Sequence, residues 1–380
     1  MSKQKIFLQS IILCLSALVS FGCGQKKIIQ PVVPFESVKT HKELHSFVAF
    51  GCHGTTLMYR IGKDKLRPTI KEYKQEMVAK TLWGNFQKDR FENLIFLGDN
   101  FYQNGLSPNV EMREKQIESV FGKNYQNIVE EIGKGNVHAV PGNHDYQAKD
   151  SDGNFTITFQ EQVNWTFHYS TPTSTFLADS TLQIIWIDSE TMLSLHEGSE
   201  KYYEALKTEL QKYNQNPKVI WRSLALHHPI QTYGKHGGAR NYGSFIKFIE
   251  PVLHFFTNPF KQDIYSVSSQ NFLEKLRNSI IESGVKVDFS FSAHEHSLHF
   301  IEEEQENPLL PKFVVISGAA GKTTEVFESQ PEKGIWNASN FGFARFYINS
   351  KEIEVVFFDG ETGDIISWEN GKKTKFLIRK

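Results

Sequence analysis

The sequence is poor in cysteine, with only three in 380 residues. Three cysteines in a chain of this length cannot form a disulfide framework, so we expect a buried apolar core to hold the fold. A surplus of charge is also missing, because the formal net charge is -1. That balance gives no bulk electrostatic attraction to nucleic acid, and we expect no nucleic-acid binding. The chain shows no internal repeat or low-complexity block, and nothing in it predicts a repeat architecture.

The N-terminus differs from the rest of the chain. Lys3 and Lys5 precede an apolar run and then small residues before Cys23, as in a secretory signal that is too short to favour a permanent membrane span. The end of this run resembles a bacterial lipoprotein cleavage site. We therefore expect a signal peptide over 1–22, a polar tether over 23–46 with lipid on Cys23, and a catalytic domain over 47–380. The expected location is the periplasm or the outer membrane.

Short apolar runs alternate with amphipathic stretches, a pattern typical of a layered α/β domain. Helical spacing predicts helices around Tyr203–Tyr213 and around Phe272–Ile280, the second ending at Gly284. The C-terminal stretch 343–369 alternates around Asn-Ser and Asp-Gly turns and predicts antiparallel hairpins. The predicted strands are 47–50, 94–97, 137–140, 183–187, 219–226, 285–291 and 312–316.

Polar motifs follow these predicted strands at the points where the strands end. They are Gly-Asp-Asn-Phe-Tyr (98–102), Gly-Asn-His-Asp (142–145), His-His-Pro (227–229) and Ala-His-Glu-His (293–296). Loops at the carboxyl ends of strands in open α/β sheets converge on one crevice. We therefore expect these motifs to form one site.

The residue types in these motifs are those that bind metal ions. Asp99 directly follows a strand and can present both carboxylate oxygens, and Tyr102 can turn its phenol oxygen to the same point. His294 and His296 lie two residues apart and face one side of an extended segment. Carboxylate, phenolate, amide and imidazole donors suit zinc, manganese or iron, and a shared carboxylate indicates a binuclear site that hydrolyses phosphate esters.

The four motifs, in this order, resemble the calcineurin-like metallophosphoesterases, and among them the purple acid phosphatases of the small tartrate-resistant type. The resemblance covers roughly residues 47 to 350 and implies an α/β fold, a four-layer sandwich of two mixed β-sheets flanked by α-helices. It also implies two divalent or mixed-valence metal ions. By this resemblance Asp99 bridges the ions, Tyr102 and His296 belong to the first site, and Asn143, His227 and His294 hold the second.

The same resemblance gives roles to residues that contact substrate. His144 is expected to contact the phosphate and to help the leaving group depart, and His236 resembles a second active-site histidine. His228 is expected to lie behind the ligands rather than among them.

Cys52 departs from the family pattern, which has an aspartate at this turn. Three interpretations stay open: Cys52 binds metal as a thiolate, His53 replaces it as a nitrogen ligand, or neither binds and one ion is lost. A thiolate favours zinc or ferrous iron over ferric iron, so we expect a weaker purple colour and activity nearer neutral pH. A nucleophilic role does not fit, since no arginine-rich phosphate loop follows Cys52.

The sequence thus predicts an acid-phosphatase-like phosphomonoesterase that acts on a phosphorylated small molecule or headgroup. One alternative is a phosphodiesterase of nucleotides or phospholipid headgroups, with the aromatic-rich stretch 242–260 as an apolar wall. The other is a surface lipoprotein without catalytic activity, because the usual aspartate is Cys52.

Overall fold

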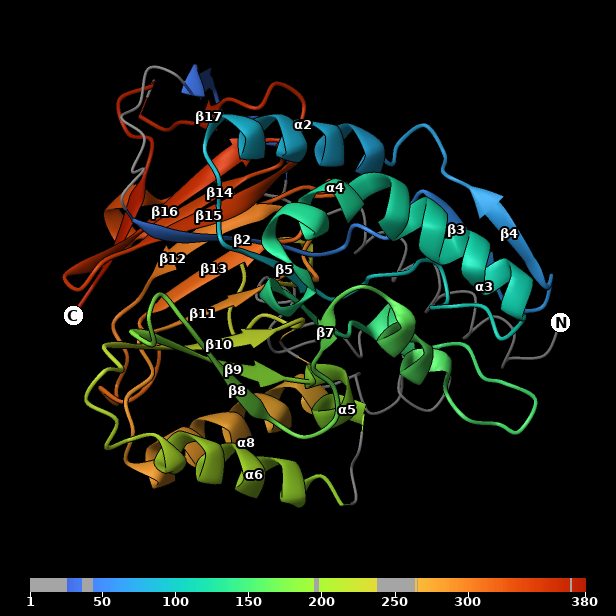
Figure 1. Cartoon of the computed structure of the whole chain (residues 1–380). Coiled ribbons are helices and arrows are strands. Elements are labelled where there is room, and N and C mark those ends of the chain that lie inside the picture. The colour runs from blue at the N-terminus through green and yellow to red at the C-terminus, as the bar shows by residue number, and fades with distance from the viewer. Residues whose placement is uncertain (1–25, 36–43, 195–197, 238–263, 265, 370) are drawn as a thin grey trace, which may run out of the picture.

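Two β-sheets pack face to face, and helices cover the outer face of each (Figure 1). The computed structural model describes residues 26–35, 44–194, 198–237, 264, 266–369 and 371–380. Phe47 shows how the sheets meet, because its ring stacks on Phe346 of its own sheet at 4.4 Å and contacts Phe291 of the other sheet at 5.6 Å. The predicted fold class, a four-layer sandwich of two mixed sheets and flanking helices, is confirmed.

The first sheet places its parallel strands next to an antiparallel half. Strands β2, β5, β6 and β7 are parallel, β15 pairs antiparallel with β2, and β16 pairs antiparallel with β15. A two-stranded hairpin, β3 with β4, lies apart from both large sheets. The order in the first sheet is β1 (Val32–Val33), β17 (Ile365–Ile366), β16 (Glu352–Asp359), β15 (Gly342–Ile348), β2 (His45–Phe50), β5 (Asn93–Leu97), β6 (Val137–Val140) and β7 (Thr166–Phe167), with β18 (Phe376–Arg379) paired to β16, and the hairpin is β3 (Leu57–Arg60) and β4 (Lys65–Pro68).

The second sheet has a parallel centre of β9, β10, β11 and β13, with antiparallel strands at both edges. The carboxyl ends of β10 and β11 therefore lie at the same edge of this sheet. Its order is β14 (Ile335–Ala338), β12 (Leu298–Glu302), β13 (Phe313–Ser317), β11 (Phe289–Ser292), β10 (Trp221–Leu226), β9 (Leu182–Ile187) and β8 (Thr173–Leu177).

Most predicted elements lie where the sequence pattern puts them. Strand β6 has the predicted bounds, and the C-terminal hairpins are present as β15, β16 and β17. Strand β11 begins at Phe289 instead of Val285, because the apolar side chains of Val285 and Val287 pack against the helix layer before the sheet ladder starts. Burial without strand pairing produces the same apolar pattern as a strand.

The helices form the two outer layers. Helix α8 ends at Gly284, which takes the left-handed conformation with φ of 70° that glycine adopts without steric cost, as predicted. Among the described helices, none combines the length and apolar composition needed to span a bilayer. Over the first sheet lie α2 (Gln75–Lys88), α3 (Val110–Ile117) and α4 (Lys123–Ile132), and over the second lie α5 (Ser189–Ser194), α6 (Glu200–Lys212) and α8 (Val267–Ser283).

Residues 26–35 pack on the first sheet, although they fall in the stretch that the sequence predicts as a tether. Strand β1 pairs with β17 and extends the first sheet, and the buried ring of Phe35 contacts Phe358 at 5.2 Å. The short apolar segments in this stretch explain the packing, since they can add a strand to an open sheet edge. The predicted signal at 1–22, Cys23 and the aromatic stretch 242–260 lie outside the described residues.

We expect Asn340 to stabilise this attachment. Its Oδ1 accepts the backbone N–H of Gln30 at 2.8 Å, and its Nδ2 donates to the Gln30 carbonyl at 3.2 Å and to Asp359 at 3.0 Å. Asn340→Ala leaves these groups without partners and should lower the free energy of unfolding by about 1–3 kcal/mol. Urea denaturation measures the loss, and limited proteolysis should show faster cleavage after Lys27. An unchanged cleavage rate would show that the segment does not depend on this contact.

Candidate metal centre

The four predicted motifs come together at the carboxyl ends of strands from both sheets. Asp99 follows β5 and takes a left-handed conformation with φ of 53°, and His294 follows β11 with φ of 62°. Gly142 makes the close approach possible, because a Cβ there would lie 2.3 Å from Asp99 Oδ1. The β5 and β6 loops can therefore meet only if this position has no side chain.

Asp99 is the centre of the cluster and is 1% exposed. Its Oδ1 accepts the backbone N–H of His144 at 3.0 Å and lies 3.4 Å from His227 Nε2. Its Oδ2 accepts the Tyr102 hydroxyl at 2.7 Å, and the Cys52 thiol lies 3.9 Å away. The two carboxylate oxygens therefore face two different groups of donor atoms.

The first carboxylate oxygen of Asp99, Oδ1, faces Asn143, His227 and His294. His227 Nδ1 donates to the Leu97 carbonyl at 2.7 Å, which leaves Nε2 as the atom with the lone pair. That Nε2 lies 3.2 Å from Asn143 Oδ1 and 3.2 Å from His294 Nδ1. The three residues assigned to the second metal site from the sequence are thus brought together, with their ligand-type atoms directed at one point.

The second carboxylate oxygen of Asp99, Oδ2, faces Cys52 and Tyr102. Cys52 is fully buried in a left-handed turn with φ of 55°, and its backbone N–H donates to the Gly98 carbonyl at 2.9 Å. The ring of His296 lies 6.3 Å from that of Tyr102, and its Nδ1 is buried without a hydrogen-bond partner among the described residues. Of the residues predicted for the first metal site, Cys52 and Tyr102 therefore approach Asp99 Oδ2, and His296 lies beside Tyr102 at the distance of this ring contact.

His53 lies away from this centre. Its ring packs against Phe50, Phe96 and Tyr125 at 5.6, 4.6 and 5.4 Å, and its Nε2 lies 3.3 Å from Asn100 Oδ1. These rings belong to the core between the first sheet and its helices. The interpretation in which His53 replaces the missing aspartate does not agree with this placement.

The two predicted substrate-contacting histidines lie at the edge of the cluster. His144 is partly exposed, its ring lies 4.5 Å from that of Tyr102, and its Nδ1 donates to the Gln103 carbonyl at 2.7 Å. The His236 ring lies 4.4 Å from that of His294, and its backbone N–H donates to Glu295 at 2.7 Å. Both imidazoles can therefore face a ligand above the metal centre.

The structure adds three residues to this site that the sequence analysis placed outside it or did not assign. His228 lies close enough to His227 and His294 to share an ion with them, and its Nδ1 lies 2.9 Å from Ser189 Oγ. Glu295 anchors the loop that carries His236. Asp145 accepts backbone N–H groups from both the 99–101 and 142–145 turns, and so fixes them together. For Glu295 and Asp145, the sequence feature that could have predicted a role in the site is their position inside the Ala-His-Glu-His and Gly-Asn-His-Asp motifs.

Electrostatics at the centre favour a cation. Burial alone would raise the pKa of Asp99, but His227, His144 and the Tyr102 hydroxyl hold this pKa well below its ordinary value. Burial, with the Asp99 charge beside them, raises the pKa of both the Cys52 thiol and the Tyr102 phenol. Burial lowers the pKa of His296 to about 3, so this imidazole is neutral and can bind metal.

The donor set fits a pair of metal ions. His227 Nε2 carries a lone pair and faces the oxygens of Asn143 and Asp99, which also carry lone pairs. Such atoms repel one another unless a cation lies among them. Among the described residues, His294 Nε2 and His296 Nδ1 have no hydrogen-bond partner, whereas buried polar atoms are normally satisfied.

Comparison with known proteins identifies a family for the chain. The family model described as calcineurin-like phosphoesterase matches residues 62–298. Among solved structures, the chain is similar to GAP50, the anchor in the inner membrane complex of Plasmodium, with a TM-score of 0.55, 15% identity and 88% of each chain covered. It is also similar to the purple acid phosphatase PPD1 from seeds of yellow lupin (Lupinus luteus), with a TM-score of 0.54 and 14% identity over 90% of this chain and 54% of that chain.

At these identities the two structures show a shared fold and no more. No curated protein sequence matches the chain. The family match begins after the turn that holds Cys52 and includes all four motifs. Since it spans more than half of the sequence, the chain belongs to the calcineurin-like phosphoesterase family.

Proposed function

We propose that this protein hydrolyses phosphate monoesters at a binuclear metal centre built around Asp99. The chain has the fold and the donor residues of a metal-dependent phosphoester hydrolase. The observation that carries the finer proposal is that each Asp99 oxygen faces its own donor group. One oxygen faces Asn143, His227 and His294, and the other faces Cys52 and Tyr102.

Two metal ions at these groups would supply positive charge for the phosphate and an activated water at neutral pH. The protein's own residues position the substrate. His144 is fixed through its Nδ1, so the opposite nitrogen, Nε2, can face a phosphate oxygen or the leaving oxygen, and it donates to that oxygen as an imidazolium. His236 extends the same surface beside His294. Asp145 keeps the two turns rigid, which preserves the spacing of the donors.

Two observations favour a function other than monoester hydrolysis. Cys52 stands where the family has a carboxylate, and one structurally similar protein is described as an anchor, which favours a non-catalytic role. The diesterase alternative depends on the stretch 242–260, outside the described residues. The similarity to a purple acid phosphatase supports the monoesterase proposal.

Parallel assays with p-nitrophenyl phosphate and bis-p-nitrophenyl phosphate test the proposal on protein loaded with zinc, manganese or iron. We expect the monoester to react at least about tenfold faster than the diester, a difference of about 1.4 kcal/mol in transition-state binding. His294→Ala serves as the background control. Faster diester cleavage would favour the diesterase, and no turnover above the His294→Ala control would favour the non-catalytic protein.

A further inference from the structure

A cavity of about 450 Å³ lies between the two sheets, away from the metal centre. It opens at the amino ends of β11 and β13, next to Asp288 and Lys312, whereas the candidate ligands follow the carboxyl ends. Asp288 and His294 are six residues apart along an extended segment, which corresponds to about 20 Å. A ligand in this cavity would therefore be separate from the substrate.

Aromatic side chains from both sheets form the floor of the cavity. The ring of Phe376 in β18 lies at the centre, stacked on Phe300 at 4.5 Å and on Trp368 at 5.2 Å. Trp336 contacts the same ring at 5.0 Å. This volume and this lining are typical of pockets that bind small organic molecules through an apolar surface.

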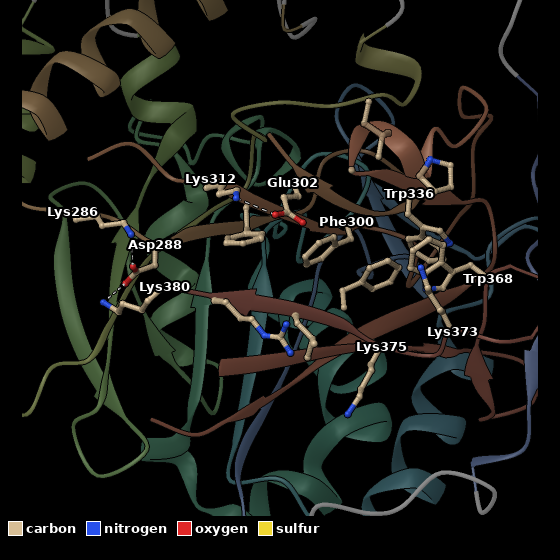
Figure 2. Close-up of a pocket in the computed structure, with 17 residues that line it drawn as sticks. Lys286, Asp288, Phe300, Glu302, Lys312, Trp336, Trp368, Lys373, Lys375 and Lys380 are labelled. Carbon is tan, nitrogen blue, oxygen red and sulfur yellow. Dashed lines mark hydrogen bonds and ion pairs between the residues drawn. The ribbon is translucent and has the colours of Figure 1, made fainter. Parts of the chain in front are cut away.

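The lining of the cavity contains more basic than acidic side chains. Six basic side chains and only two acidic ones line it, namely Lys286, Lys312, Lys373, Lys375, Arg379 and Lys380 against Asp288 and Glu302. Figure 2 shows Lys286, Asp288 and Lys380 at one end and Trp336, Trp368 and Lys373 at the other. The body of a ligand would thus meet aromatic rings while its charged end met lysine or arginine.

Each of the six basic side chains pairs with a carboxylate. Lys286 and Lys380 pair with the buried Asp288, Lys312 with Glu302 and Glu304, and Lys375 with the buried Glu354. The pairs of Lys373 and Arg379 are the ones that are exposed and do not involve a carboxylate of the lining. Lys373 contacts Glu369 at 2.7 Å with 51% and 42% of the two side chains exposed, and Arg379 contacts Glu352 at 2.9 Å with 62% and 25% exposed. Exposed pairs of this kind contribute little to stability. Glu369 and Glu352 do not line the cavity, so an anion inside it can attract the same cations at small cost.

Trp336 supplies an independent sign of a ligand. It lines the cavity and is 2% exposed, yet its indole N–H has no hydrogen-bond partner in the described part of the chain. The indole N–H of Trp368 is likewise buried and without a partner there. Buried donors normally find an acceptor, so two unpartnered donors on tryptophans that line one cavity show that the polar groups beside it are incompletely satisfied by the described residues.

We propose that this cavity binds a small amphipathic anion, with an aromatic or aliphatic body on the Phe376 floor and a carboxylate, sulfonate or phosphate group among the basic side chains of the lining. The anionic group follows from these basic side chains, and the apolar body from the floor. The site makes the protein a binder of such molecules independently of hydrolysis at the metal centre.

A matched pair of fluorescent probes tests the proposal on the full-length protein. The anion 8-anilinonaphthalene-1-sulfonate should bind with one-to-one stoichiometry by calorimetry and quench tryptophan fluorescence. Its neutral relative N-phenyl-1-naphthylamine lacks the sulfonate and should bind at least about fivefold more weakly. Trp368→Ala should weaken binding of both probes about tenfold through lost contact area.

Lys373→Gln should weaken binding of the anionic probe about threefold and leave binding of the neutral probe unchanged. The chain offers a close control in Lys115→Gln, since Lys115 pairs with Glu111 at 2.6 Å with the same i,i+4 spacing as Lys373 with Glu369. Trp83→Ala controls for the loss of a partly buried tryptophan stacked on a phenylalanine.

Equal binding of the two probes, or equal effects of Lys373→Gln and Lys115→Gln, would overturn the proposal. His294→Ala should retain probe binding, and the cavity variants should retain phosphoester hydrolysis. Failure of the cavity proposal and failure of the proposed function are therefore distinguishable.

Discussion

Asp99→Asn should lower kcat/KM for phosphoester hydrolysis on the order of 10³-fold. The substitution keeps the shape of the side chain and removes its charge. The oxygens of Asp99 contact both His227 and Tyr102, so its loss affects both donor groups at once. An amide at this position can bind through one oxygen only and cannot balance the charge of two cations. We expect elemental analysis to show less than two metal ions per chain in the variant.

The control for this prediction is Asp359→Asn, the same isosteric change at another buried carboxylate. Asp359 accepts the backbone N–H groups of Glu361 and Thr362 at 3.0 Å and contacts none of the candidate ligands. This variant should keep its activity within about twofold. If Asp99→Asn retains its full metal content and more than about a tenth of its activity, Asp99 does not bridge two ions and the proposed centre is wrong.

The second large effect is expected at Cys52, on the choice of metal ion. Cys52→Asp should raise the affinity of the first site for ferric iron by at least about 100-fold, because a hard anionic oxygen replaces a soft sulfur donor. Iron-loaded Cys52→Asp should then be purple through tyrosinate from Tyr102, and the unmutated protein should be much paler. Absorbance spectra and metal analysis of protein purified without air measure both changes.

Cobalt(II) distinguishes the interpretations of Cys52 that the structure leaves open. A thiolate ligand gives a sulfur-to-cobalt charge-transfer band in the near ultraviolet, which Cys52→Ser should remove. If no such band exists and Cys52→Ala binds metal as tightly as the unmutated chain, the thiol only fills space. Strong visible tyrosinate absorbance in unmutated, iron-loaded protein would contradict the expected preference for divalent ions.

A nucleophilic role for Cys52 finds no support in its surroundings. The side chain is fully buried, and burial together with the Asp99 charge raises the pKa of the thiol well above its ordinary value. Reactive cysteines have a lowered pKa and partial exposure. Without a bound cation the thiol stays protonated, so any role of Cys52 in the reaction depends on metal.

Local patterns predicted those parts of the site in which a strand runs directly into a turn. Asp99 after β5, Asn143 after β6, His227 after β10 and His294 after β11 each follow a short apolar strand, and the direction of the strand carries them to the same edge. The same alternation predicted a layered α/β domain, and the family resemblance implied the four-layer sandwich, which is confirmed. These features depend on residues a few positions apart, which a sequence displays directly.

The sequence by itself thus determined the strands and the four motifs at their ends, and its family resemblance supplied the residues that we propose as ligands of two metal ions. Tertiary structure alone decided that His53 turns into the aromatic core, that His228 approaches His294, and that residues 26–35 extend the first sheet. It also decided that Phe376 and Trp336 meet in a charged cavity at the other end of the strands. The reason is physical: these outcomes depend on which side chains from distant segments pack together, and the packing is set by the whole chain and not by local pattern.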